Sequence, residues 1–203
     1  MTLKSISALG VSFGTAAPIA SFGAQCATLS ERSDIGSVII NCAVDVAGVT
    51  TRLAEILEFS LPAGPGMTTA SNRGTNGLWL TPRSWLVLCR PDDEFQLIER
   101  VNGSFPDKRV NAAVFSDYLS WFELNGPKSL DVLTAGGFVS LDTKGLPEGC
   151  CKRTLLAGIP VVLLRSNDDG WLLGVERSRA SYFSDWLQHA ATRESRISSY
   201  KAS

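Results

Sequence analysis

The sequence contains few of the residues on which catalytic and metal sites usually depend. Of its 203 residues, a single one is a histidine, His189, and charged residues account for only 19%. The 19 basic residues nearly balance the 20 acidic ones, and no basic run occurs, so we do not expect a nucleic-acid partner. Because a net charge near zero gives little solubility through self-repulsion, we expect part of the surface to be covered by another protein.

The cysteine pattern does not indicate a disulfide framework or a zinc motif. The count of five is odd, and no CxxC pair occurs. Cys42 and Cys89 lie within apolar runs, which predicts that they act as small buried hydrophobic residues. The neighbours Cys150 and Cys151 cannot easily bind one metal ion together, since adjacent side chains diverge. Reduced thiols in the cytoplasm fit this pattern best.

Long apolar runs are also absent. No stretch of about 18 strongly apolar residues occurs, so we expect no membrane-spanning helix and no membrane partner. The first 27 residues are small and apolar and follow Lys4, somewhat as in a signal peptide. Gly10, Gly14 and Pro18 interrupt this stretch, and a single lysine is a weak charged region. We therefore expect a non-secretory arm, which lies against another surface because it has little charge.

No nucleotide or catalytic motif stands out. The segment "GPGMTTASNRG" lacks the G-x-G-x-x-G spacing, and no P-loop, nucleophile elbow or HExxH occurs. Asp92, Asp93 and Glu94 stand at an expected helix N-terminus, where capping explains them. His189 falls near the end of the last expected helix, which favours a helix-terminus role over catalysis. The residues therefore predict no catalytic, cofactor-binding or metal site on this chain.

Hydrophobic periodicity predicts alternating strands and helices separated by Gly, Pro, Asn and Ser. The expected helices cover residues 49–59, 91–103, 126–137 and 177–193. The expected strands cover residues 37–44, about 67–70, 78–80, 84–90, two parts of 109–126, 152–158, 159–166 and 170–176.

The two halves of the sequence resemble each other. In each half a strand and a helix precede a loop, and then a hairpin whose last strand begins with a tryptophan leads into a helix. The pattern predicts an α+β fold of two related units, each an antiparallel sheet covered by helices. We expect an arm at 1–30, units at 31–108 and 109–192, and a tail at 193–203.

The segment "NGLWLTPRSWLVL" carries the best candidates for a partner interface. A turn at Pro82 and Arg83 joins two short strands that contain Trp79 and Trp85. Leu78 and Leu80 alternate with Trp79, so the tryptophan and the leucines point to opposite faces of the strand. We expect Trp85, Trp171 and Trp186 in the core, and Trp79, Pro82 and Arg83 at an interface with another protein.

Five pieces in order resemble one known family, over a span from about residue 22 to 191. They are "FGAQCATLSER", "LWLTPRSWLVL", "VFSDYLSWFELNGPKSLDVL", "RTLLAGIPVVLLR" and "RSRASYFSDWL". No single piece is specific, but their order and spacing resemble the gamma subunit of heterotetrameric sarcosine oxidase, a flavoenzyme.

The resemblance implies a fold similar to the folate-binding part of the glycine-cleavage T-protein. It implies that the alpha, beta and delta subunits are the partners and hold the FAD, FMN, NAD, folate and zinc sites. The gamma chain then binds no flavin, packs mainly on alpha, and supports assembly of a cytoplasmic bacterial complex.

Some residues depart from the family pattern and leave the amine substrate open. Val114 stands where an aspartate is common, Phe138 replaces a cysteine, and Asp142 lies near the place of a histidine. The partner oxidase could act on sarcosine, dimethylglycine, an N-methylated amino acid or a hydroxyproline-type amine. Two further hypotheses stay open. One is a folate-binding aminomethyltransferase-like protein or assembly factor, for which Asp117 and Glu123 are the candidate acids, and the other is a scaffold for an unrelated partner.

Overall fold

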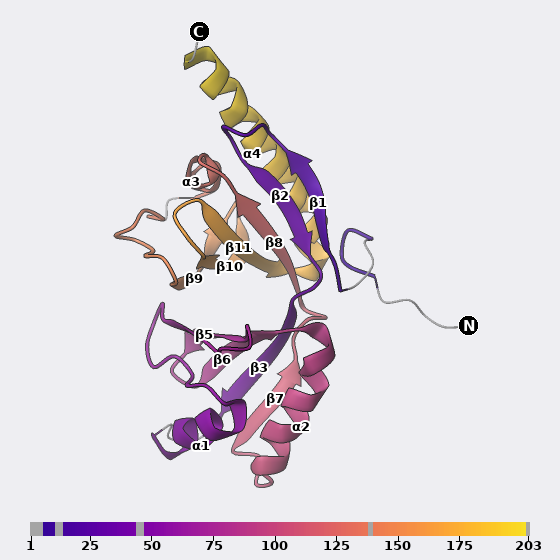
Figure 1. The fold of residues 1–203 in the computed structure, drawn as a ribbon, viewed down its shortest axis with the longest axis vertical. Coiled ribbons are helices and arrows are strands. Elements are labelled where there is room, and N and C mark those ends of the chain that lie inside the picture. The colour runs from indigo at the N-terminus through magenta and orange to yellow at the C-terminus, as the bar shows by residue number, and fades with distance from the viewer. Residues whose placement is uncertain (1–5, 11–13, 44–46, 138–139, 202–203) are drawn as a thin grey trace, which may run out of the picture. The chain divides into compact units, whose positions relative to one another are not determined.

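A computed structural model describes the chain except for residues 1–5, 11–13, 44–46, 138–139 and 202–203. The chain forms two compact units, each with its own sheet (Figure 1). The middle unit is Asp34–Asp117, and the terminal unit combines Met1–Ser33 with Tyr118–Ser203.

The middle unit is a five-stranded antiparallel sheet with the order β4-β5-β6-β3-β7. Its elements are β3 (Gly36–Cys42), α1 (Ala47–Leu57), β4 (Thr68–Ala70), β5 (Asn76–Thr81), β6 (Ser84–Cys89), the 3₁₀ turn η1 (Pro91–Asp93), α2 (Glu94–Ser104) and β7 (Val110–Val114).

The core of the middle unit lies between the sheet and its two helices. Alternate residues of β3 and β6, such as Ile40 and Trp85, pack with Leu53 of α1 and Val101 of α2. The Trp85 indole N–H donates to the Pro62 carbonyl oxygen at 2.9 Å, so its burial leaves no polar group unpaired. Cys42 and Cys89 belong to the same buried cluster, which confirms their predicted role.

The terminal unit is a six-stranded antiparallel sheet with the order β1-β2-β8-β11-β10-β9. Its elements are β1 (Ala16–Ser21), β2 (Thr28–Arg32), β8 (Leu119–Asn125), α3 (Ser129–Thr134), β9 (Cys151–Leu156), β10 (Ile159–Arg165), β11 (Gly170–Glu176), the 3₁₀ turn η2 (Arg177–Arg179) and α4 (Ala180–Lys201).

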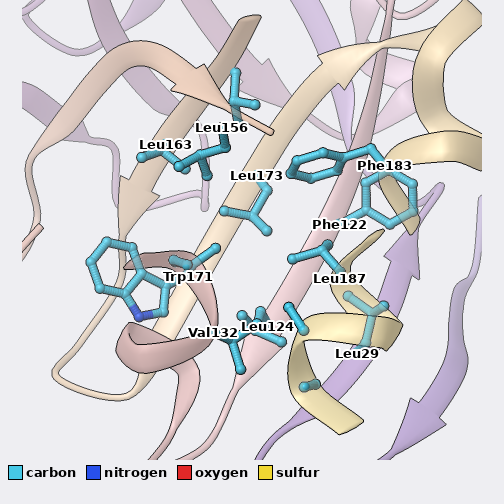
Figure 2. Packing of buried hydrophobic residues seen from close by; sticks show 14 of the residues in the cluster. Leu29, Phe122, Leu124, Val132, Leu156, Leu163, Trp171, Leu173, Phe183 and Leu187 are labelled. Atoms are coloured by element: carbon cyan, nitrogen blue, oxygen red, sulfur yellow. The ribbon is translucent and has the colours of Figure 1, made fainter. Parts of the chain in front are cut away.

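The core of the terminal unit gathers large side chains from the sheet and from α3 and α4 (Figure 2). Phe122 of β8 packs against Phe183 of α4, with ring centroids 6.1 Å apart. Trp171 of β11 is fully buried, and its indole N–H donates to the Ser129 hydroxyl at 3.0 Å. The helix that begins at residue 129 is therefore tied to the sheet by both packing and a hydrogen bond.

The predicted internal repeat is present in the strand order. Read from one edge of each sheet to the other, the strand order β4-β5-β6-β3-β7 of the middle unit matches β9-β10-β11-β8-β2 of the terminal unit. The terminal sheet has β1 as an additional edge strand. Trp85 and Trp171 stand at corresponding places near the starts of β6 and β11. The fifth strand has a different origin in each unit, since β7 follows α2 in the chain whereas β2 comes from the N-terminal region.

The structure corrects the expected boundaries. The expected arm at 1–30 is not separate over residues 16–30, because β1 and β2 pair into the terminal sheet and Leu29 is fully buried. The division lies after residues 33 and 117, not at 30 and 108. The segment 193–203 is not a separate tail either, because α4 continues to Lys201. The first difference has a local cause: β2, "TLSER", has a single large apolar residue, so its pattern is too weak to predict a strand.

Candidate partner-binding surfaces

The β5–β6 hairpin presents two of the predicted interface residues at its tip. Pro82 and Arg83 form a two-residue connection, and both are exposed. The Arg83 N–H donates to the Thr81 hydroxyl at 3.2 Å, and the Arg83 carbonyl accepts from the Cys42 N–H at 2.8 Å. The tip is thus an exposed feature whose backbone is fixed to the end of β3.

Trp79 does not lie on the free face of the sheet, where we expected it. It stands directly opposite Trp85 in the hairpin register, so both side chains project to the same side of the sheet. Trp79 is half-buried and packs against the core of the middle unit, whereas its neighbour Leu78 is fully buried. Its expected place on a free face was wrong, because alternation separates two faces but does not say which one the helices cover.

A groove with a volume of about 530 Å³ lies in the middle unit. Its four apolar lining residues are buried or half-buried and come from the end of α1, the end of β6 and one side of α2, and we call them the floor. Five charged side chains, all but one of them exposed, also line the groove, and we call them the rim. The apolar lining is Ile56, Leu57, Cys89 and Leu97, the charged lining is Glu58, Arg73, Arg90, Asp93 and Arg100, and Ser71, Asn72, Thr75 and Gln96 complete it.

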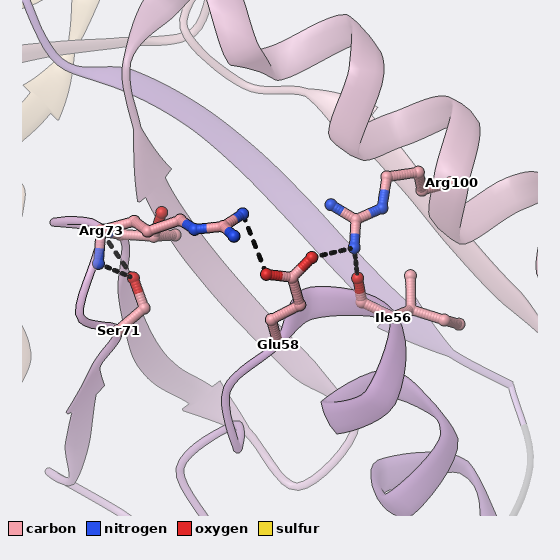
Figure 3. A network of polar contacts seen from close by, with 6 residues as sticks. Ile56, Glu58, Ser71, Arg73 and Arg100 are labelled. Carbon is pink, nitrogen blue, oxygen red and sulfur yellow. Dashed lines mark hydrogen bonds and ion pairs between the residues drawn. The ribbon is translucent and has the colours of Figure 1, made fainter.

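Glu58 organises this groove by bridging two arginines (Figure 3). Its Oε2 lies 2.9 Å from Nη1 of Arg73, and its Oε1 accepts from Nη2 of Arg100 at 3.3 Å. Arg100 also donates to the Ile56 carbonyl oxygen, while the Arg73 N–H donates to the Ser71 hydroxyl at 3.2 Å. The carboxylate therefore connects the residue after α1, the 71–75 loop and α2.

The remaining titratable groups of the groove have shifted pKa values. The hydrogen bond from Arg90 holds the pKa of Asp93 below its usual range, and this bond and the charge of Asp93 raise the pKa of Arg90. Burial, with smaller contributions from the charges of Glu94 and Asp93, raises the pKa of the Cys89 thiol to about 12. At neutral pH Arg90 and Asp93 therefore both carry their charges, and the Cys89 thiol is neutral and a poor nucleophile.

The acids at the start of α2 do not cap the helix with their side chains. Asp93 occupies the N-cap position without a side-chain capping bond and instead binds Arg90. Glu94 is buried, and its Oε1 accepts from the Ser37 N–H at 2.6 Å and from the Ser116 hydroxyl. Burial raises the pKa of Glu94, and the two hydrogen bonds partly oppose that shift. The three acids do stand in the first turns of η1 and α2, as expected, but the expected side-chain capping was wrong. Glu94 instead joins β3 and the residues after β7 to α2.

The two acids considered for a pterin do not offer a suitable site. Asp117 is exposed in the turn between β7 and β8. Glu123 of β8 lies 3.1 Å from Nη1 of Arg32 on β2, so its charge is already balanced within the sheet. Neither acid lines the groove described above, so neither is placed to face a pterin bound there.

The other positions singled out from the sequence have local roles. His189 Nδ1 lies 2.7 Å from the Asp185 carbonyl oxygen one helical turn away. Asp142 accepts from the Ser140 hydroxyl at 2.7 Å and from the Gly145 N–H at 2.8 Å, which closes a loop. Val114 is half-buried at the end of β7, and Phe138 lies outside the described residues.

The cysteines are all free thiols, with Cys150 half-buried and Cys151 buried. Among the described residues, no three His, Cys, Asp or Glu side chains gather closely enough to hold a metal ion. In the same part of the chain, no helix combines the length and the apolar character that crossing a membrane requires.

The fold is similar to those of several solved structures, of which two are described. One is a chain of the heterotetrameric sarcosine oxidase from Corynebacterium sp. U-96, solved in complex with pyrrole 2-carboxylate. The match has a TM-score of 0.77 and 24% identity, and covers 88% of this chain and 89% of that one. The other is the glycine cleavage system aminomethyltransferase T from Bartonella henselae, with a TM-score of 0.60, 13% identity, and coverage of 82% and 46%.

The sequence is similar to two curated proteins. The sarcosine oxidase subunit gamma of Corynebacterium sp. strain P-1 is 28% identical over 145 residues, which are 71% of this chain and 70% of that protein. The same subunit of strain U-96 is 26% identical, with coverage of 66% and 65%. The model of the sarcosine oxidase, gamma subunit family matches residues 42–193, which span most of both units. The chain therefore belongs to the sarcosine oxidase, gamma subunit family.

Proposed function

We propose that this chain is the non-catalytic gamma subunit of a heterotetrameric, flavin-dependent amine oxidase. The complex would demethylate sarcosine or a related secondary or tertiary amine by oxidation. The observation that supports this most strongly is the family match over residues 42–193, together with a shared fold over nearly nine-tenths of the chain. Such a match over both units supports a whole subunit of that type and not merely a shared domain.

The proposed role of the chain is assembly with the large alpha subunit. The candidate contact is the hairpin tip of Pro82 and Arg83, with the exposed edge of Trp79 beside it. Arginine and tryptophan are enriched at the centres of protein interfaces, and the fixed backbone of this tip would lose little conformational freedom on binding. The FAD, FMN, NAD, folate and zinc of the oxidase would then reside in the alpha, beta and delta partners.

A cytoplasmic location is part of the same proposal. All five cysteines are free, and Cys150 is only half-buried. A reducing compartment keeps such thiols free, whereas an oxidising one would expose them to pairing.

The test is purification of the tagged chain from its own host, followed by mass spectrometry and a visible absorption spectrum. The expected result is a yellow eluate with one large, one medium and one small partner, which oxidises sarcosine or a related N-methyl amine. A colourless chain without partners would contradict the proposal.

The folate hypothesis has its own measurement. Titration of the isolated full chain with tetrahydrofolate, followed through tryptophan fluorescence, should show no saturable quenching. Tight binding that is lost in Asp117→Asn or Glu123→Gln would replace the subunit proposal with a folate-binding one.

A further inference from the structure

The groove of the middle unit combines features that suit an acidic and partly apolar peptide. Three arginines and two carboxylates line it, so its rim carries one net positive charge. The floor of Ile56, Leu57, Cys89 and Leu97 is apolar. An apolar centre inside a polar rim is the usual composition of a protein interface.

The arginines of the rim are accessible and have donors to spare. The side chains of Arg73 and Arg90 are 79% and 81% exposed, and that of Arg100 is 43% exposed. The bonds of Arg90 to Asp93 use Nε and Nη2, and the ion pair of Arg73 with Glu58 uses Nη1. A guanidinium group has five N–H donors, so each arginine can bind a second carboxylate while it keeps its first.

The backbone of Glu58 supports a binding role for this rim. Glu58 has a φ of 63°, a left-handed conformation that glycine adopts without cost and glutamate does not. In return its carboxylate fixes Arg73 and Arg100 from two different elements (Figure 3). A left-handed residue commonly ends a helix, and Glu58 directly follows α1, so this conformation serves to turn its carboxylate towards the two arginines.

We propose that this groove binds an acidic segment of a partner subunit. An apolar side chain of that segment would lie on the floor, and neighbouring Asp or Glu side chains would bind Arg73, Arg90 and Arg100. This inference rests on the proposed function, because it requires a partner. A small inorganic anion could bind the arginines, but it would gain nothing from the apolar floor.

Photo-crosslinking in the assembled complex tests the proposal. A benzophenone amino acid replaces Asn72 or Gln96, which line the groove, and Glu99 serves as the control because it is exposed on α2 outside the groove. The tagged chain is purified from its host, irradiated and analysed by mass spectrometry. We expect Asn72 and Gln96 positions, and not Glu99, to crosslink to one identified partner segment that contains an acid within about three residues.

Three outcomes would overturn it. One is a complex that forms while neither groove position crosslinks, which leaves the proposed function intact. Another is crosslinking to a segment without acids. The third is a chain that assembles with nothing, which removes the proposed function as well.

Charge reversal provides an independent readout. In Arg73→Glu the exposed rim cation becomes an acid, and Arg52→Glu makes the same change on α1 at a side chain that is 59% exposed and outside the groove. We expect Arg73→Glu to raise the dissociation constant of the complex by about tenfold or more, with a smaller effect at high salt, and Arg52→Glu to leave it nearly unchanged. Equal effects would contradict the proposal. So would binding of inorganic phosphate that Arg73→Glu abolishes without any effect on assembly.

Discussion

Trp79 and Trp85 stand directly opposite each other across the β5–β6 hairpin and project to the same side of the sheet. They differ in depth: Trp85 is 2% exposed and hydrogen-bonded to Pro62, whereas Trp79 is half-buried at the border of the same core. One cross-strand pair thus joins a core residue to a partly exposed residue that we propose as a partner contact.

This pair gives the first prediction. Trp85→Ala should lower the free energy of unfolding by about 3–5 kcal/mol, because it leaves a large cavity and an unpaired Pro62 carbonyl. Trp79→Ala should lower it by less, because part of its surface is already in water, and should also weaken assembly. Denaturant unfolding of the chain and affinity measurements on the complex separate the two effects. Equal losses of stability with intact assembly would contradict the partner role of Trp79.

The buried carboxyl of Glu94 predicts a pH-dependent difference between the protein and Glu94→Gln. The folded pKa is raised above its ordinary value of 4.5, so the folded state holds this proton more tightly than the unfolded state does. As pH rises from 4.5 to the folded pKa, the parent should lose stability relative to the variant, by about 1.4 kcal/mol for each pH unit between these two pKa values. Below 4.5 and above the folded pKa the difference should stay constant.

Urea unfolding of both proteins across this pH range measures the difference. Glutamine keeps an acceptor for the Ser37 N–H, so the comparison isolates the charge. A parent that gains stability over Glu94→Gln as pH rises would show that the hydrogen bonds, and not burial, dominate this pKa.

The thiols should differ in reactivity in the folded protein. Cys150 is half-buried, whereas Cys26, Cys42, Cys89 and Cys151 are buried, and the pKa of Cys89 is about 12. Iodoacetamide at pH 8 should therefore modify Cys150 first, and the other four only after unfolding, because alkylation requires an accessible thiolate. Peptide mass spectrometry after a short exposure gives the order. Early modification of Cys89 would mean that the groove floor opens readily.

Arg165 is expected to contribute more to stability than its ion-pair partner Asp168. The Arg165 side chain is 4% exposed and donates to the Leu146 carbonyl at 3.1 Å, whereas that of Asp168 is 79% exposed. Arg165 also lies over the Trp171 ring, 5.3 Å from its centroid. Arg165→Ala should cost about 2–4 kcal/mol through the unpaired carbonyl and lost packing, and Asp168→Asn less than about 1 kcal/mol.

Thermal or denaturant unfolding of these two variants provides the check. Similar losses of unfolding free energy in both variants would mean that Arg165 stabilises the protein through its ion pair with Asp168 and not through its buried contacts. Such a result would contradict the expected ranking.

The local sequence pattern was enough to predict much of the fold. The β-branched run in β3, the helical spacing of Leu53 and Leu57, and the Pro82 turn each involve residues within a few positions of one another. The repeat was visible for the same reason, since both units place a tryptophan near the start of the strand that closes a hairpin. The burial of Cys42 and Cys89 also followed from their apolar neighbours.

The candidate surfaces depended on contacts between distant parts of the chain. Glu58 meets Arg100 across 42 positions, and Glu94 meets Ser37 across 57. No periodicity indicates such pairs, because each element offers many side chains and only packing decides which of them meet. The exposed hairpin tip could be predicted from its turn residues, but the groove could not.

The sequence by itself determined the kinds and order of the elements from β3 onward, the duplication and the family, because these depend on spacing along the chain. Only the tertiary structure decided that β2 completes the sheet of the terminal unit, where Leu29 pairs with Leu124. It also decided that Trp79 shares the face of Trp85 and that Glu58 holds two arginines beside an apolar floor. The physical reason is that strand pairing and side-chain burial are chosen by competition among distant segments, and a local pattern does not contain that competition.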